Sequence, residues 1–175
     1  GIPSNFYKNG KTYEIYSASR HDGIQIKETR RVVAEMVNQF KRYKGVEVSV
    51  YPTNRNAYAD VKNGCVQVNF ANYSYIFEVH FNSSASSSAN GVEVWVTPNE
   101  SSTKVEQNIV NKVASLGFTN RGVKKEYFAV ITSAKNKGIS SALVETCFIS
   151  NKEDMNKYNA KFTQICGAMV DGIAE

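Results

Sequence analysis

The chain has 175 residues and a formal net charge of +5 at pH 7. Its hydrophobic fraction of 42% is typical of a globular protein and too high for a disordered one. At about 150 residues per domain, this length predicts a single domain. Three cysteines exclude a disulfide framework, so we expect free, mostly buried thiols of a protein made in the cytosol. No apolar run reaches the ~18 residues of a membrane helix.

The positive charge suits an anionic partner such as nucleic acid, lipid or teichoic acid. No recognised nucleic-acid motif accompanies it, so we expect no nucleic-acid partner. The N-terminus has neither the basic region nor the apolar region of a signal peptide, and we expect synthesis without one. We interpret residues 1–10 as an extension or cloning remnant and 11–175 as the domain, which could be excised from a longer protein.

Strands and helices alternate along the first half of the chain. A β-rich segment predicts a strand over 12–19, which a polar turn at 20–23 ends. Apolar residues at helical spacing predict a helix over 27–43, and a second strand follows over 46–51. Residues 54–70 are ambiguous between a short helix near 57–61 and a strand.

The second half continues the alternation. We expect strands over 75–81 and 91–97, separated by a serine-rich loop, and a helix from about 101 to 116. Short strands are predicted over 127–132 and 141–146, and a C-terminal helix from 152 onward. The order predicts an α/β fold, a three-layer sandwich whose mostly parallel mixed sheet is flanked by helices.

The two histidines fall at or near the carboxyl ends of predicted strands, where open α/β sheets bind ligands. Strand alternation puts Glu78 and His80 on one face. Glu28 opens the first predicted helix, where a carboxylate also simply favours the helix dipole. His21, His80 and Glu28 would make a three-ligand set of the catalytic zinc type, leaving a fourth position for water. No short metal motif fixes their spacing.

Glu145 follows an apolar run that predicts a buried strand. An ionised carboxylate there is costly unless it is paired or lies near a metal. An ion pair with Lys or Arg is one interpretation, and a general base beside a metal-bound water is the other. Alternation places Cys147 on the same face as Glu145, and we interpret it as a packing thiol.

Several segments together resemble one known family. His80-Phe81-Asn82 after an apolar strand resembles the HxN segment of zinc-dependent N-acetylmuramoyl-L-alanine amidases of the Amidase_3 type. Segments 91–96 (GVEVWV) and 121–124 (RGVK) resemble the next two motifs of that family. Segment 142–151 (ALVETCFISN), followed by Glu153-Asp154, resembles its most specific stretch. The order and approximate intervals match from about Lys11 to the end.

The resemblance implies one Zn²⁺ ion held by His21, Glu28 and His80, with Glu145 as the catalytic carboxylate. The residues around His21 differ from the family's usual GHGG, and the interval from His21 to Glu28 is short, which leaves Glu35 as an alternative third ligand. Asn82 could hydrogen-bond near the site or could simply end its strand.

The implied reaction is hydrolysis of the amide between N-acetylmuramic acid and L-alanine in peptidoglycan. We expect a monomeric catalytic domain of a phage endolysin or bacterial autolysin that acts on the outer side of the cell wall, with anionic wall polymers as further partners. Two alternatives stay open. One is a zinc peptidase that cuts within the stem peptide, and the other is a non-catalytic wall-binding module.

Overall fold

The computed structural model describes residues 7–19 and 23–175. Its elements in chain order are β1 (Tyr7–Ser17), α1 (Gly23–Phe40), β2 (Lys44–Val50), α2 (Ala57–Lys62), a 3₁₀ turn (Phe70–Asn72), β3 (Tyr75–Asn82), β4 (Val92–Val96), α3 (Lys104–Ala114), β5 (Asn120–Lys125), α4 (Ala129–Asn136), β6 (Ser141–Phe148), α5 (Lys152–Ala160) and α6 (Phe162–Ala174). None of the helices in the described ranges is long and apolar enough to cross a membrane.

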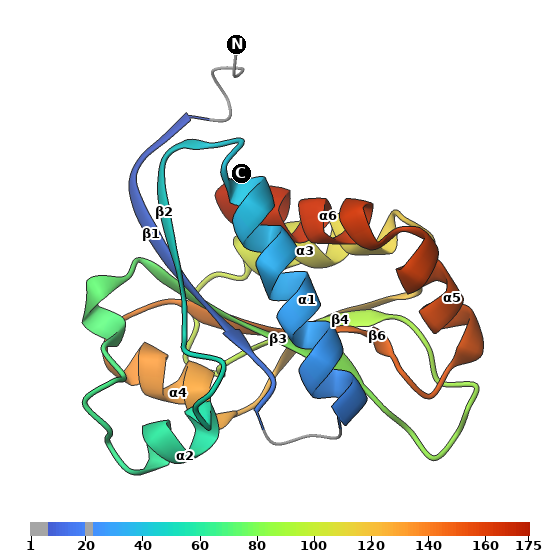
Figure 1. The fold of residues 1–175 in the computed structure, drawn as a ribbon, viewed down its shortest axis with the longest axis horizontal. Helices are drawn as coiled ribbons and strands as arrows, with labels where there is room; N and C mark the ends of the chain where they lie inside the picture. The colour runs from blue at the N-terminus through green and yellow to red at the C-terminus, as the bar shows by residue number, and fades with distance from the viewer. Residues whose placement is uncertain (1–6, 20–22) are drawn as a thin grey trace.

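The six strands form one sheet in the order β2-β1-β3-β6-β4-β5. All neighbours are parallel except β4 and β6, which are antiparallel. Helices α1, α3 and α6 cover one face of the sheet, and α2 and α4 lie on the other (Figure 1). This confirms the predicted three-layer α/β sandwich with a mostly parallel mixed sheet.

The two faces of the sheet bury clusters of different size. The larger cluster joins Phe77, Val79 and Phe81 of β3 to the apolar stripes of α1, α3 and α6. The smaller cluster joins Tyr16 and Ile76 to residues around α2 and α4. Because side chains alternate along β3, Glu78 and His80 point to the smaller-cluster side. The fold thus leaves polar groups on the face that only two short helices cover.

The strand predicted over 127–132 is wrong, because this segment begins helix α4. Val130, Ile131 and Ala134 are buried at helical spacing, and the Ser141 hydroxyl donates to the carbonyl of Ile131 at 2.8 Å. A short apolar run does not show whether its residues repeat at the spacing of a strand or of a helix. The strand lies earlier, as β5, in a polar segment at the edge of the sheet.

Two further segments resolve into helices. The ambiguous segment 54–70 contains α2, in agreement with the helical alternative, and no strand. The C-terminal helix is two helices, α5 and α6, which are joined at Lys161. All three cysteines are free, with Cys147 and Cys166 buried and Cys65 partly buried, as expected.

The loop after β6 is fastened to the start of β4. Asn151 accepts a hydrogen bond from the backbone NH of Asp154 at 2.8 Å and so caps α5. The buried Asp154 carboxylate accepts from the backbone NH groups of Phe148 and Gly91, both at 2.9 Å. Gly91 has φ +109, and a Cβ there would lie 2.4 Å from the carbonyl oxygen of Thr119. These hydrogen bonds hold the end of β6 next to the start of β4.

A buried carboxylate in β1 should make the stability depend on pH. Glu14 is 4% exposed and accepts a hydrogen bond from the Tyr16 hydroxyl at 2.8 Å, and burial raises its pKa to about 7. Between the unfolded and folded pKa values the folded state binds more protons, so stability falls as pH rises through this range. Relative to the parent protein, the free energy of unfolding of Glu14→Gln should therefore rise by about 3 kcal/mol between pH 5 and pH 8. Urea unfolding of both proteins at the two pH values measures this difference. An equal change of the free energy of unfolding with pH in both proteins would contradict the prediction.

Candidate active site

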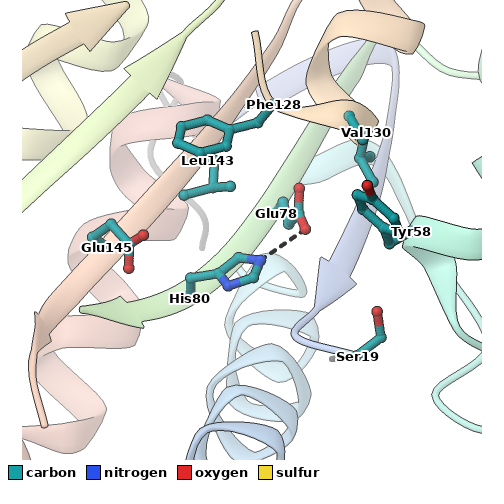
Figure 2. Close-up of a pocket in the computed structure, with 9 residues that line it drawn as sticks. Ser19, Tyr58, Glu78, His80, Phe128, Val130, Leu143 and Glu145 are labelled. Carbon is teal, nitrogen blue, oxygen red and sulfur yellow. Dashed lines mark hydrogen bonds and ion pairs between the residues drawn. The ribbon is translucent and has the colours of Figure 1, made fainter. Parts of the chain in front are cut away.

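A pocket of about 190 Å³ opens at the carboxyl ends of β3 and β6. Its lining comes from the segment after β1, from α2, from the start of α4 and from the two strands, as Figure 2 shows. The residues are Ser19, Tyr58, Glu78, His80, Phe128, Ala129, Val130, Leu143 and Glu145. The polar groups therefore sit on the sheet, and the rings of Tyr58 and Phe128 form walls around them.

His80 and Glu145 are direct neighbours in this pocket. They are register partners in the parallel ladder between β3 and β6. Nε2 of His80 lies 2.7 Å from Oε2 of Glu78, and both side chains are largely buried. An ionised Glu78 makes Nε2 the protonated donor, which fixes the tautomer and the orientation of the ring. Figure 2 shows His80 between Glu78 and Glu145.

The described residues give the Glu145 carboxyl group few interactions that offset the cost of its burial. Its Oε2 atom is buried and has no hydrogen-bond partner among the described residues. Burial raises the pKa of Glu145 to about 8, with Glu93 and Glu78 adding to the increase and His80 opposing it. In the described part of the chain no salt bridge joins Glu145 to Lys or Arg, which removes support for the ion-pair interpretation. Perturbed carboxyl groups of this kind in a cleft are typical of functional sites.

The structure does not bring Glu28 into this pocket. Its buried carboxylate accepts from Arg31 Nη1 at 2.5 Å and from the Tyr158 hydroxyl at 3.2 Å. Glu35, two turns along α1, accepts from the side-chain amide of Asn38 at 3.2 Å. Neither carboxylate lines the pocket with His80 and Glu145.

The structure describes only one of the other two candidates, Asn82. His21 lies outside the described residues, so the structure places only part of the predicted ligand set. Asn82 ends β3, and its side-chain oxygen accepts from the backbone NH of Ser83 at 2.9 Å. Within the described ranges no group of three or more His, Cys, Asp and Glu side chains is arranged to hold a metal.

Cys147 does not share the face of Glu145, contrary to the alternation argument. The register between β3 and β6 shifts after His80, since His80 pairs with Glu145 and Asn82 pairs with Phe148. The extra residue in β6 turns Cys147 into the larger core cluster, where its Sγ lies 3.9 Å from the sulfur of Met155. Burial raises the pKa of this thiol, consistent with a packing role.

Sequence reasoning missed the second acidic side chain beside Glu145. Glu93 is its register partner across the antiparallel β4–β6 pair and is 3% exposed. Arg121 and Lys124 of β5 both contact Glu93. The alternation in segment 91–96 predicted a strand, but only the antiparallel pairing with β6 brings Glu93 to the site.

Comparisons with known proteins identify the family of the chain. A sequence model of the Amidase_3 family, described as N-acetylmuramoyl-L-alanine amidase, matches residues 9–175. The N-acetylmuramoyl-L-alanine amidase LytC of Bacillus subtilis (strain 168) is 29% identical over 140 residues, which are 78% of this chain and 27% of LytC. The chain thus spans about a quarter of the length of this curated relative.

Solved structures share the fold. An N-acetylmuramoyl-L-alanine amidase from Clostridium difficile 630 superposes with a TM-score of 0.77 at 18% identity, covering 95% of this chain and 96% of that one. The catalytic domain of the CD27L endolysin, which targets Clostridia difficile, gives 0.74 at 21% identity, covering 93% and 96%. The catalytic domain of CwlV from Bacillus (Paenibacillus) polymyxa var. colistinus gives 0.75 at 18%, covering 93% and 96%. Since the family's sequence model also spans nearly all of the chain, this chain belongs to the N-acetylmuramoyl-L-alanine amidase family.

Proposed function

We propose that this chain hydrolyses the amide between the lactyl group of N-acetylmuramic acid and L-alanine in peptidoglycan, with the help of one bound Zn²⁺ ion. Membership of the amidase family supports the reaction class. The observation that carries the proposal is that His80 and Glu145 are register partners at the floor of a pocket and that the buried Oε2 atom of Glu145 has no hydrogen-bond partner among residues 7–19 and 23–175. An unsatisfied buried carboxyl oxygen is costly, and a catalytic role or a bound ion is one explanation for it.

The donor chemistry of the residues fits a zinc ion. Zinc binds imidazole nitrogen and carboxylate oxygen, and the second nitrogen of a zinc-bound histidine is commonly held by a carboxylate, as Glu78 holds His80 at 2.7 Å. We propose His21, Glu28 and His80 as the ligands, although Glu28 would have to exchange its contacts with Arg31 and Tyr158 for the ion. When bound, zinc acts as a Lewis acid and lowers the pKa of water toward ~7.

Glu145 would move the proton during the reaction. Burial raises the pKa of Glu145 to about 8 without a bound ion, and a cation beside it would lower that pKa toward neutral pH, where a carboxyl group can both accept and donate a proton. Glu145 would take a proton from the attacking water and deliver it to the leaving amine, which departs poorly as an anion. Glu78 would keep His80 in one orientation throughout.

The pocket walls would hold the substrate and limit the access of water. Tyr58 comes from α2, Phe128 from the residue that precedes α4, and Leu143 from β6. The rings of Phe128 and Trp95 form a T-shaped contact with 5.4 Å between centroids, which extends the wall toward β4. We further propose that the chain acts as a monomeric catalytic domain on the outer side of the cell wall, as in an endolysin or autolysin, and that its positive charge holds it on anionic wall polymers.

Digestion of purified peptidoglycan tests the proposal directly. We expect free L-alanine N-termini and intact glycan strands in the products, as identified by mass spectrometry. The activity should be lost with a chelator and restored by zinc. Cleavage within the stem peptide would replace the proposal with a zinc peptidase. Wall binding without cleavage, on several wall types, would identify a binding module.

The third zinc ligand can be identified by metal content. Glu28→Ala should lower the bound zinc well below one ion per chain, because it removes the proposed third ligand, a buried carboxylate in the second turn of α1. Glu35→Ala is the matched control, since Glu35 lies on the same helix and contacts only Asn38 in a described hydrogen bond. Elemental analysis of both purified variants gives the answer. Zinc loss from Glu35→Ala alone would reassign the ligand.

A further inference from the structure

Two cations of β5 converge on one carboxylate beside the active site. Nε of Arg121 lies 2.6 Å from Oε1 of Glu93, and Nζ of Lys124 lies 3.2 Å from the same oxygen. Glu93 is 3% exposed, whereas the Arg121 and Lys124 side chains are each 34% exposed. One negative charge is therefore buried beneath two positive charges that reach solvent, which leaves an excess of one positive charge at the surface.

An irregularity in β5 creates this convergence. Residues three apart in a regular strand face opposite sides of the sheet. Val92 pairs with Asn120 and Val94 pairs with Val123, so β5 has one residue more than β4 between these pairs. Gly122 adopts φ +83 within this step. Bulges of this kind redirect side chains and are common beside active sites. The bulge turns Arg121 to the side that Lys124 already faces.

This pair of cations, Arg121 and Lys124, lies beside the pocket without lining it. Glu93, to which both are bound, is the register partner of Glu145. The Lys124 ammonium lies 5.5 Å from the centre of the Trp95 ring, and that ring contacts Phe128 of the pocket wall. A substrate placed over Glu145 would therefore extend past Trp95 to the two cations.

We propose that Arg121 and Lys124 bind a carboxylate group of the peptide portion of the substrate. This inference rests on the proposed function. In the amide that is cleaved, the lactyl carboxyl group is already consumed, so the carboxylates of a muramoyl peptide lie on its peptide side. The arrangement therefore directs the peptide, and not the sugar, toward β5.

Two soluble substrates test this inference. One is an N-acetylmuramoyl peptide with its peptide carboxylates free, and the other is the same molecule with every carboxylate converted to a carboxamide. We expect the parent protein to prefer the free form about tenfold in kcat/KM, mainly through KM, as is reasonable for charge-assisted contacts at a partly exposed site. Added salt should reduce the preference.

Variants separate binding from structure. Lys124→Met keeps the Arg121–Glu93 ion pair and should lower the preference to about threefold. The triple variant Glu93→Gln/Arg121→Met/Lys124→Met removes all three charges together and should abolish the preference. Lys125→Met, on the exposed neighbour of Lys124, is the matched control and should keep the full preference. A purely structural role would change kcat/KM equally for both substrates.

The outcomes of this experiment distinguish the two proposals. Cleavage of both substrates with equal kcat/KM by the parent protein would overturn the carboxylate site and leave the amidase proposal standing. Cleavage of neither, together with no release of L-alanine N-termini from purified peptidoglycan, would overturn the amidase proposal. In that case calorimetric titration of the free peptide and of its carboxamide still tests the carboxylate site. Equal dissociation constants would overturn the site, and tighter binding of the carboxylate form would support it.

Discussion

Replacing Glu145 by glutamine is expected to lower kcat for wall hydrolysis by at least ~10²-fold, the usual contribution of a proton-transferring group. Glutamine has nearly the same shape but can neither accept nor return the proton. Burial raises the pKa of Glu145 to about 8, and one buried oxygen of its carboxyl group has no partner in the described part of the chain, so a neutral amide should be tolerated. The fold and the zinc content are expected to be retained.

Release of soluble fragments from purified walls, measured at one zinc equivalent, gives the rate. Glu126→Gln serves as the matched control, since Glu126 is an exposed carboxylate that bonds only to the backbone NH of Tyr127 in the described contacts. The control should retain full activity. A Glu145→Gln protein with activity near that of the control would show that another group moves the proton.

The fold was predictable where apolar residues repeat over long segments. Segments 75–81 and 141–146 each carry a run of buried apolar residues, and both are strands of the sheet centre. Segment 120–125 was not predicted because an edge strand of polar residues lacks that signal. Segment 127–132 was predicted wrongly because its apolar residues suit a strand as well as the helix that the contact with β6 favours.

The site was predictable only in part, since each residue depends on a different level of structure. His80 and Glu145 could be found because each stands near the end of an apolar strand, and the parallel ladder then makes them neighbours. Glu93 could not be found, since its position depends on the antiparallel pairing of β4 with β6. Segment 121–124 stood out as a motif, but the contact of Arg121 with Glu93 could not be predicted, because only the bulge at Gly122 turns Arg121 toward Glu93.

Loss of the His80 imidazole is expected to abolish stoichiometric zinc binding and, with it, wall hydrolysis. His80 is buried at the pocket floor, where Glu78 holds one ring nitrogen at 2.7 Å. His80→Ala removes a ligand outright. Glu78→Ala keeps the ligand but removes its carboxylate partner, and should weaken zinc binding by about 10- to 100-fold, as is usual for groups that orient a metal ligand.

Competition with a chromophoric chelator measures both affinities, and thermal unfolding of the zinc-free proteins shows whether each variant still folds. Glu78→Gln is the conservative control, because its amide oxygen can still accept from Nε2 and should restore much of the affinity. Full zinc occupancy in a folded His80→Ala protein would remove His80 from the ligand set. Equal zinc affinity in the parent and Glu78→Ala proteins would mean that the Glu78–His80 contact has no part in metal binding.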